Sequence, residues 1–304
     1  MLSLWVGIAA LAQLINAGTV IMDKYVLACL KCGVKTPVAY AFWISLLSGF
    51  VIVMVPFGVI DIPSSYVLIL SSIAAVSFIF SLISLYSALH ESIASDVIPA
   101  VGAISAITTV LLAAKWLHTD LPQFAYVAFT FLVLGTLLIS HFRFTYRSFI
   151  LVLFAGVLFG FTAYVTKLIF LETDFVDGFF WSRMTNVAGA LLLLLWPSNR
   201  KAIFSGAKDS SSGVKWLVLT NKTLAGIASV LTLFAISIGS VSIVNAMAGL
   251  QFVFVIVIAY VFAKVFPRVF EGEVRQQNYR HKLYGVALIV LGIAALFAGD
   301  ILLT

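Results

Sequence analysis

The stretch YVLILSSIAAVSFIFSLISLYSAL, from Tyr66 to Leu89, decides the fold class. It contains no Asp, Glu, Lys or Arg, and its serines do not alternate with its apolar residues as they would in a barrel strand. At about 1.5 Å per residue, a helix of this length crosses the roughly 30 Å hydrocarbon core of a bilayer. The stretch is therefore predicted to be a transmembrane helix.

The rest of the chain is of the same kind. Of its 304 residues, 62% are hydrophobic and only 10% are charged, whereas soluble proteins carry about 25% charged residues. This composition excludes a soluble globular protein. The sequence predicts an all-α integral membrane protein with ten transmembrane helices: Leu4–Met22, Val38–Pro56, Tyr66–Leu89, Asp96–Leu117, Pro122–Ser140, Phe149–Phe170, Phe179–Trp196, Trp216–Ile238, Val241–Val265 and Lys282–Ile301.

The polar connections are short and leave no room for a soluble catalytic or sensory domain. The longest, 197–215 and 266–281, could each hold at most a turn or a short surface helix. With ten crossings, fourteen Lys and Arg residues lie on one side and only Lys115 and Lys167 on the other. The positive-inside rule then predicts non-cytoplasmic termini for a multi-pass protein of the plasma (inner) membrane. The net charge of +6 reflects this loop asymmetry, and no nucleic-acid partner is expected.

Short sequence correspondences recur in the same order in both halves of the chain and predict an internal repeat. Five helices per copy would invert the second copy relative to the first. The predicted repeats are residues 1–145 and 146–304. The matched pairs are Thr19–Lys24 with Thr162–Lys167, Leu85–Ala88 with Leu233–Ile236, and Leu132–Gly135 with Ile289–Gly292.

Two stretches carry a resemblance to a known family. Tyr284–Gly292 is similar to the closing helix, and Ser240–Ala246 to the turn into the ninth helix, of EamA-like members of the drug/metabolite transporter superfamily. The resemblance implies ten helices in two five-helix repeats and the export or exchange of small organic metabolites. Three features depart from the family pattern. The predicted non-cytoplasmic termini differ from the cytoplasmic termini of some family members. Ala128 stands opposite Gly285, and Lys115–His118 replaces a stretch in which the family often carries glutamate.

Charged and amide side chains at membrane depth are the default candidates for a solute site, because burying them in lipid is costly. Arg183 and Asn186 are three residues apart and are predicted to share one helix face. The guanidinium would suit a carboxylate or a phosphate. In the alternative interpretation, Arg183 lies about 6 Å from the helix start and snorkels to the interface, or pairs with Asp177 or Asp174.

Other polar and aromatic residues complete the predicted substrate-binding set. The amides could equally serve as hydrogen-bonding glue between helices, the lysine could snorkel, and the tryptophans could anchor the chain at the interface. These residues are Gln13, Asn16, Trp43, Trp181, Lys222, Asn245 and Gln251.

The remaining motifs point to structure instead of chemistry. Cys29 and Cys32 have the spacing of half a zinc site or of a redox dithiol. No second ligand pair completes a zinc site and the βαβ context of a thioredoxin-like motif is absent, so neither a metal nor a cofactor is expected. Gly156 and Gly160 are spaced for close helix packing.

These features favour a secondary transporter of a small organic metabolite, such as an amino acid or an organic acid, that works by alternating access between the repeats. The alternative is a non-transporting structural or channel-like membrane protein. An intramembrane enzyme is disfavoured, because no motif places reactive groups at depth. The expected partners are a small-molecule solute, the lipid bilayer and, in a homodimer, a second copy of the chain.

Overall fold

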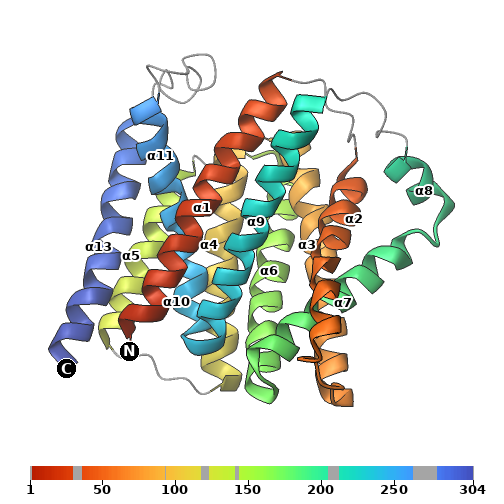
Figure 1. Cartoon of the computed structure of the whole chain (residues 1–304). Helices are drawn as coiled ribbons and strands as arrows, with labels where there is room; N and C mark the ends of the chain where they lie inside the picture. The colour runs from red at the N-terminus through yellow and green to blue at the C-terminus, as the bar shows by residue number, and fades with distance from the viewer. Residues whose placement is uncertain are drawn as a thin grey trace. The chain divides into compact units, whose positions relative to one another are not determined.

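The structure, a computed structural model, describes residues 2–29, 36–92, 94–117, 123–140, 144–204, 212–262 and 279–303. Every regular element in these ranges is a helix, which confirms the all-α prediction (Figure 1). The elements are α1 (Leu2–Cys29), α2 (Pro37–Leu47), η1 (Ser48–Phe57), α3 (Ser65–Glu91), α4 (Ala94–Leu112), η2 (Ala113–Leu117), α5 (Gln123–Ile139), α6 (Tyr146–Glu172), α7 (Phe175–Leu193), α8 (Pro197–Phe204), α9 (Ser212–Ile238), α10 (Val241–Ala246), η3 (Met247–Gly249), α11 (Leu250–Phe262) and α13 (Tyr279–Leu303).

Each of the ten predicted segments overlaps at least one helix. Val38–Pro56 and Asp96–Leu117 continue into η1 and η2, and the described part of Val241–Val265 consists of α10, η3 and α11. Among the described residues, seven helical stretches are long and apolar enough to cross a membrane, and an eighth does so if α7 and α8 form one span bent by 106°. α5 and the part of α13 from Leu283 to Leu296 are apolar but shorter. The chain is therefore a multi-pass helical membrane protein, whereas ten crossings remain a prediction.

Polar side chains cap the starts of the long helices α3 and α6. Ser64 accepts a hydrogen bond from the Val67 amide before α3, at 3.2 Å, and Thr145 does the same for Ser148 before α6. Such caps satisfy amides that have no partner in the first turn, a requirement that is stricter near lipid than in water. Helix starts are thus set by local chemistry as well as by the apolar pattern.

The helices group into two compact units, each assembled from separate stretches of the chain. The first consists of Met1–Cys32, Thr119–Phe142 and Asp209–Thr304, and the second of Gly33–His118 and Arg143–Lys208. The first unit therefore holds α1, α5, α9, α10, α11 and α13, and the second holds α2, α3, α4, α6, α7 and α8. Each unit combines helices from both predicted repeats.

In the second unit, α6 packs against both α3 and α4. A Cβ added to Gly160 would lie 2.5 Å from the Ser105 carbonyl oxygen, and one added to Gly156 would lie 2.6 Å from Ile104 Cβ. The Thr109 hydroxyl donates to the Gly160 carbonyl across the same contact, at 3.1 Å. The packing role predicted for the two glycines is confirmed.

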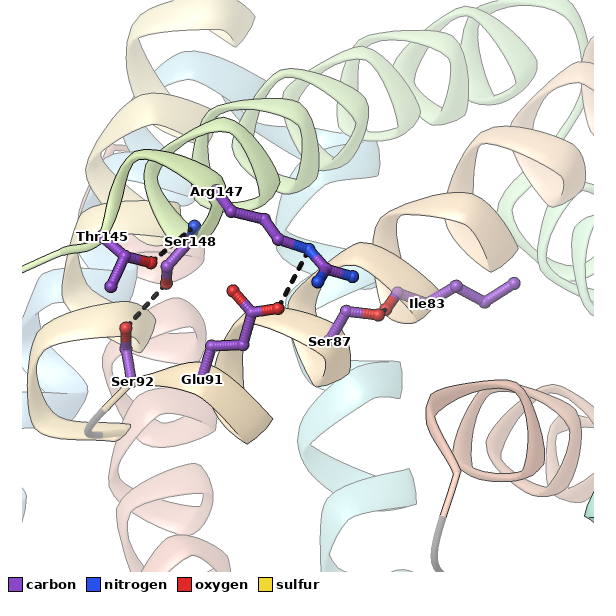
Figure 2. Close-up of polar contacts among 7 residues, drawn as sticks. All are labelled: Ile83, Ser87, Glu91, Ser92, Thr145, Arg147 and Ser148. Atoms are coloured by element: carbon purple, nitrogen blue, oxygen red, sulfur yellow. Dashed lines mark hydrogen bonds and ion pairs between the residues drawn. The ribbon is translucent and has the colours of Figure 1, made fainter.

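The end of α3 is joined to the start of α6 by polar contacts (Figure 2). The Ser92 and Ser148 hydroxyl oxygens lie 2.7 Å apart, and Arg147 Nε lies 3.1 Å from Glu91 Oε1. The Arg147 side chain is 83% exposed. The ion pair is therefore a surface contact, and its energy is reduced by solvent screening.

Replacing Glu91 by Gln is accordingly expected to change the stability of the protein by less than about 1 kcal/mol. The measurement is the melting temperature of the purified protein in detergent, at low and at high salt. A Ser84→Ala variant at a buried site of α3 provides the comparison. A large, salt-independent loss in Glu91→Gln would show that the ion pair carries more of the fold than its exposure implies.

In the first unit, α5 and α13 lie side by side (Figure 1) and meet through a reciprocal glycine contact. A Cβ on Gly135 would lie 2.7 Å from the Gly285 carbonyl oxygen, and a Cβ on Gly285 would lie 2.7 Å from that of Gly135. A Cβ on Gly292 would similarly lie 2.9 Å from the Ala128 carbonyl oxygen. Without side chains at these positions, the two backbones can approach closely.

Candidate functional site

Helix α7 carries the strongest predicted site residues, and it begins earlier than the sequence prediction placed it. It starts at Phe175 instead of Phe179, because Asp174 accepts the Asp177 amide hydrogen bond at 2.9 Å and acts as an N-cap. Arg183 therefore lies about 12 Å along the helix instead of about 6 Å. The extra turn places its charge deeper in the helix than the prediction assumed.

One polar side-chain atom of Arg183 and one of Asn186 have no hydrogen-bond partner among the described residues. Arg183 Nε and Asn186 Oδ1 are buried without a hydrogen-bond partner in the described part of the chain, and Asn186 is only 6% exposed. The guanidinium carbon of Arg183 lies 5.6 Å from the centre of the Phe179 ring. This cation–π contact on the same helix is its one specific partner among the described residues.

The ion pair considered in the sequence analysis, from Arg183 to Asp174 or Asp177, is not present. Asp174 caps α7 through its Oδ1 atom, and the Oδ1 atom of Asp177 accepts the Asp61 amide at 2.9 Å. Both acidic side chains thus hold the backbone around the start of α7. Arg183 forms no ion pair with any described residue.

Two serines on neighbouring helices share this unsatisfied character. Ser45 on α2 and Ser71 on α3 are both 0% exposed, and neither hydroxyl oxygen has a hydrogen-bond partner among the residues that the structure describes. Both helices pack on α7. We call Arg183, Asn186, Ser45 and Ser71 the Arg183 cluster.

Backbone contacts place both serines at the level of Arg183 and Asn186. The Ser48 hydroxyl donates to the Ser45 carbonyl at 2.6 Å and also approaches the Arg183 carbonyl at 3.4 Å. From α3, the Ser71 carbonyl accepts a hydrogen bond from the Thr185 hydroxyl of α7 at 3.1 Å. The cluster therefore gathers around one or two turns in the middle of α7.

The electrostatics of the cluster follow from the charges on its three helices. Helices α2, α3 and α7 contain few Asp, Glu, His, Lys or Arg residues. Besides Arg183, these are His90 and Glu91 at the end of α3 and Asp177 in the first turn of α7. Glu91 pairs with Arg147, and Asp177 is bonded to backbone. The middle of these helices therefore carries one uncompensated positive charge, which favours an anion.

Trp181 and Trp43, also predicted as site residues, make packing and hydrogen-bond contacts within the second unit. The Trp181 indole donates to the Asp61 carbonyl at 3.0 Å and so ties the loop before α3 to α7. Trp43 packs on the buried group formed by Ala39, Phe42, Ala190 and Ile203.

Replacing Trp181 by Phe keeps an apolar ring but removes the hydrogen bond to Asp61. We expect a stability loss of about 1 kcal/mol, the usual net value of one such bond. Thermal unfolding in detergent measures it, with Trp196→Phe at an exposed position as the control. Equal melting temperatures for the two variants would show that the bond to Asp61 does not hold the loop.

The other predicted site residues belong to the first unit. Gln13 on α1 is buried, and Asn16 one turn later is half-buried and accepts the Thr19 hydroxyl through its carbonyl. Lys222 on α9, Asn245 on α10 and Gln251 on α11 are half-buried. The structure thus places these five residues on four helices, while it gathers Arg183 and Asn186 with two further polar groups.

The cysteine motif gives no structural evidence for a metal. Cys29 ends α1, but its side chain and the whole of Cys32 lie outside the described residues. In the described ranges, no group of three or more His, Cys, Asp or Glu side chains is placed to hold a metal ion.

Sequence reasoning missed Ser45 and Ser71. Serine in a transmembrane helix usually bonds to a carbonyl of the preceding turn, as Ser84 does with Phe80 at 2.9 Å. Nothing in the sequence distinguishes a serine that is satisfied in this way from one that is not.

Comparison with known proteins supports the fold alone. No family model and no curated protein matches the chain. A solved structure described as "Crystal structure of protein" aligns with 95% of this chain and 98% of its own, with a TM-score of 0.65 and 14% sequence identity. The arrangement of helices therefore recurs in a protein of similar length.

Proposed function

We propose that this protein is a secondary transporter that moves a small organic metabolite, such as an amino acid or an organic acid, across the plasma membrane. The observation that carries the proposal is the Arg183 cluster. A charged side chain at this depth of a membrane helix is costly, and it is usually found where it faces protein, water or a bound solute. Here the protein supplies no counter-ion among the described residues, so a solute is the partner we propose.

We also propose ten crossings arranged as two inverted five-helix repeats, as the resemblance to EamA-like transporters implies. The contact between α5 and α13 supports this arrangement. Sequence matching pairs Gly135 with Gly292 and Ala128 with Gly285. Gly135 meets Gly285, and Gly292 meets Ala128, so each contact is converted into the other by exchanging the repeats. Contacts that interchange in this way are expected around a twofold axis.

Inverted repeats provide a mechanism for transport without a nucleotide-binding domain. The two repeats have the same fold in opposite orientations, so exchanging their conformations opens a central site first to one side and then to the other. A solute bound in the site crosses during the exchange. ATP hydrolysis is not part of this proposal, because the sequence has no phosphate-binding loop of the Gly-x-x-x-x-Gly-Lys-Ser/Thr type.

The test is uptake into liposomes that contain the purified full-length chain. Labelled amino acids, organic acids and organic cations are offered one at a time, and each active solute is then tested for counterflow. Saturable uptake with counterflow is the expected result. Flux that does not saturate and shows no counterflow would identify a channel, and absence of flux for every solute would argue for a structural protein.

A further inference from the structure

We infer that the Arg183 cluster binds a small monocarboxylate that carries a neutral hydrogen-bond donor beside its carboxylate, as a 2-hydroxy acid does. The inference rests on the proposed transport function for its biological meaning, but the binding itself can be measured separately. It is argued from the charge of the cluster and from the hydrogen-bonding capacity that its four side chains leave unused.

Charge selects the ionic class of the ligand. The cluster holds one positive charge, and the middle parts of α2, α3 and α7 hold no other. A monoanion brings the occupied site to neutrality, which is the least costly state for a buried group. A zwitterion would leave a charge of +1, and a dicarboxylate or a doubly charged phosphate would leave −1.

Geometry selects a carboxylate as the charged group. A guanidinium offers parallel N–H donors that match the two oxygens of a carboxylate. The Phe179 ring lies against the guanidinium group, and Nε is buried without a partner. A carboxylate can satisfy Nε together with one terminal nitrogen, which is a common bidentate arrangement.

The unpaired amide oxygen of Asn186 favours a ligand that carries a hydrogen-bond donor. It is buried and can only accept, so an occupant that consists of acceptors alone would leave it unsatisfied. A hydroxyl next to the carboxylate supplies that donor without adding charge. The Ser45 and Ser71 hydroxyls can each donate and accept, so they can complete the hydrogen bonds of the same small ligand.

The test compares three ligands of nearly the same size that differ at one group. Lactate has a carboxylate and a hydroxyl, alanine has a carboxylate and an ammonium, and propionate has a carboxylate alone. Binding of each to the full-length protein in detergent is measured by calorimetry and by the shift in melting temperature. Malate and inorganic phosphate complete the set as doubly charged probes.

We expect lactate to bind more tightly than the other four probes, by roughly tenfold or more, since hydrogen bonds to charged groups and unsatisfied buried acceptors have effects of that size. Arg183→Gln and Asn186→Leu should each remove most of the preference. Ser84→Ala provides the matched control for Ser71→Ala, because Ser84 is a buried serine of the same helix whose hydroxyl is already bonded.

Each outcome decides the inference. Tighter binding of alanine would refute the charge argument, equal binding of propionate and lactate would refute the role of Asn186, and tighter binding of phosphate or malate would refute the monoanion. Lactate binding that survives Arg183→Gln would overturn the site. Lactate binding without uptake in liposomes would support the site and contradict the transport proposal. Uptake of other solutes that is unaffected by Arg183→Gln would support the transport proposal and contradict the site.

Discussion

A Gly160→Leu variant is expected to lose most of its folded protein. The added Cβ alone would lie 2.5 Å from the Ser105 carbonyl oxygen and 2.6 Å from Thr108 Cβ, and three more carbons must be placed beyond it. The first of these neighbours is backbone, which cannot rotate away as a side chain can. Separating α4 from α6 also breaks the hydrogen bond from Thr109 to the Gly160 carbonyl. We expect a destabilisation of about 3 kcal/mol or more.

The yield of monodisperse protein in size-exclusion chromatography and its melting temperature measure this effect. Gly7→Leu is the control, since Gly7 is exposed on α1 and a Cβ there would meet nothing within 4 Å. That variant should keep its yield, and its melting temperature should rise slightly because leucine has a better helix propensity than glycine. Equal losses in both variants would mean that the contact between α4 and α6 is not the cause.

An Arg183→Leu variant is expected to be more stable than the parent protein and to lose its solute site. Arg183 has no counter-ion among the described residues, and its Nε atom is buried without a partner. Leucine removes that cost and keeps apolar contact with Phe179. The gain should be about 2 kcal/mol, in line with the penalty for arginine in the middle of a membrane helix. Binding and uptake of the solute should fall to background, because the guanidinium that binds the anion has been removed.

A gain in stability together with a loss of binding distinguishes a residue of the solute site from a residue that holds the fold together. If Arg183 holds the fold together, its replacement lowers the melting temperature and impairs binding only through misfolding. Arg147→Leu serves as the control, since Arg147 is an arginine of the same unit with an exposed side chain. It should leave both stability and binding nearly unchanged. A lower melting temperature for Arg183→Leu than for Arg147→Leu would contradict the assignment.

Much of the fold could be predicted from the sequence, because apolar length decides which segments become membrane helices. The points at which an α-helix changes into a 3₁₀ helix within a segment could not be predicted. The predicted helix from Val38 to Pro56 is an α-helix only to Leu47 and continues as a 3₁₀ helix from Ser48, where Ser48 bonds to carbonyls of α2 and α7. Such interruptions depend on tertiary partners. The start of α7 could have been predicted from the sequence, since Asp174 and Asp177 form a capping pattern three residues apart.

The candidate site divides in the same way. Arg183 and Asn186 could be found from charge, polarity and helical spacing, because those properties belong to single residues and to one helix. Ser45 and Ser71 could not, since the five serines Ser72, Ser77, Ser81, Ser84 and Ser87 on α3 all donate to carbonyls. Which hydroxyl remains without a partner is decided by the packing of three helices, and the sequence alone does not specify that packing.

The composition of the first unit has a consequence for how the chain matures during its synthesis. α1 packs against α9, which begins only at Ser212, whereas α1 ends at Cys29. At the usual pace of the ribosome, the early helix spends roughly 10 to 40 s without its partner. Throughout that interval its contact face, including Trp5 opposite Gly239, must be shielded by lipid or by the insertion machinery. Nascent chains halted before Ser212 should therefore be degraded faster than chains halted after α9 has been made.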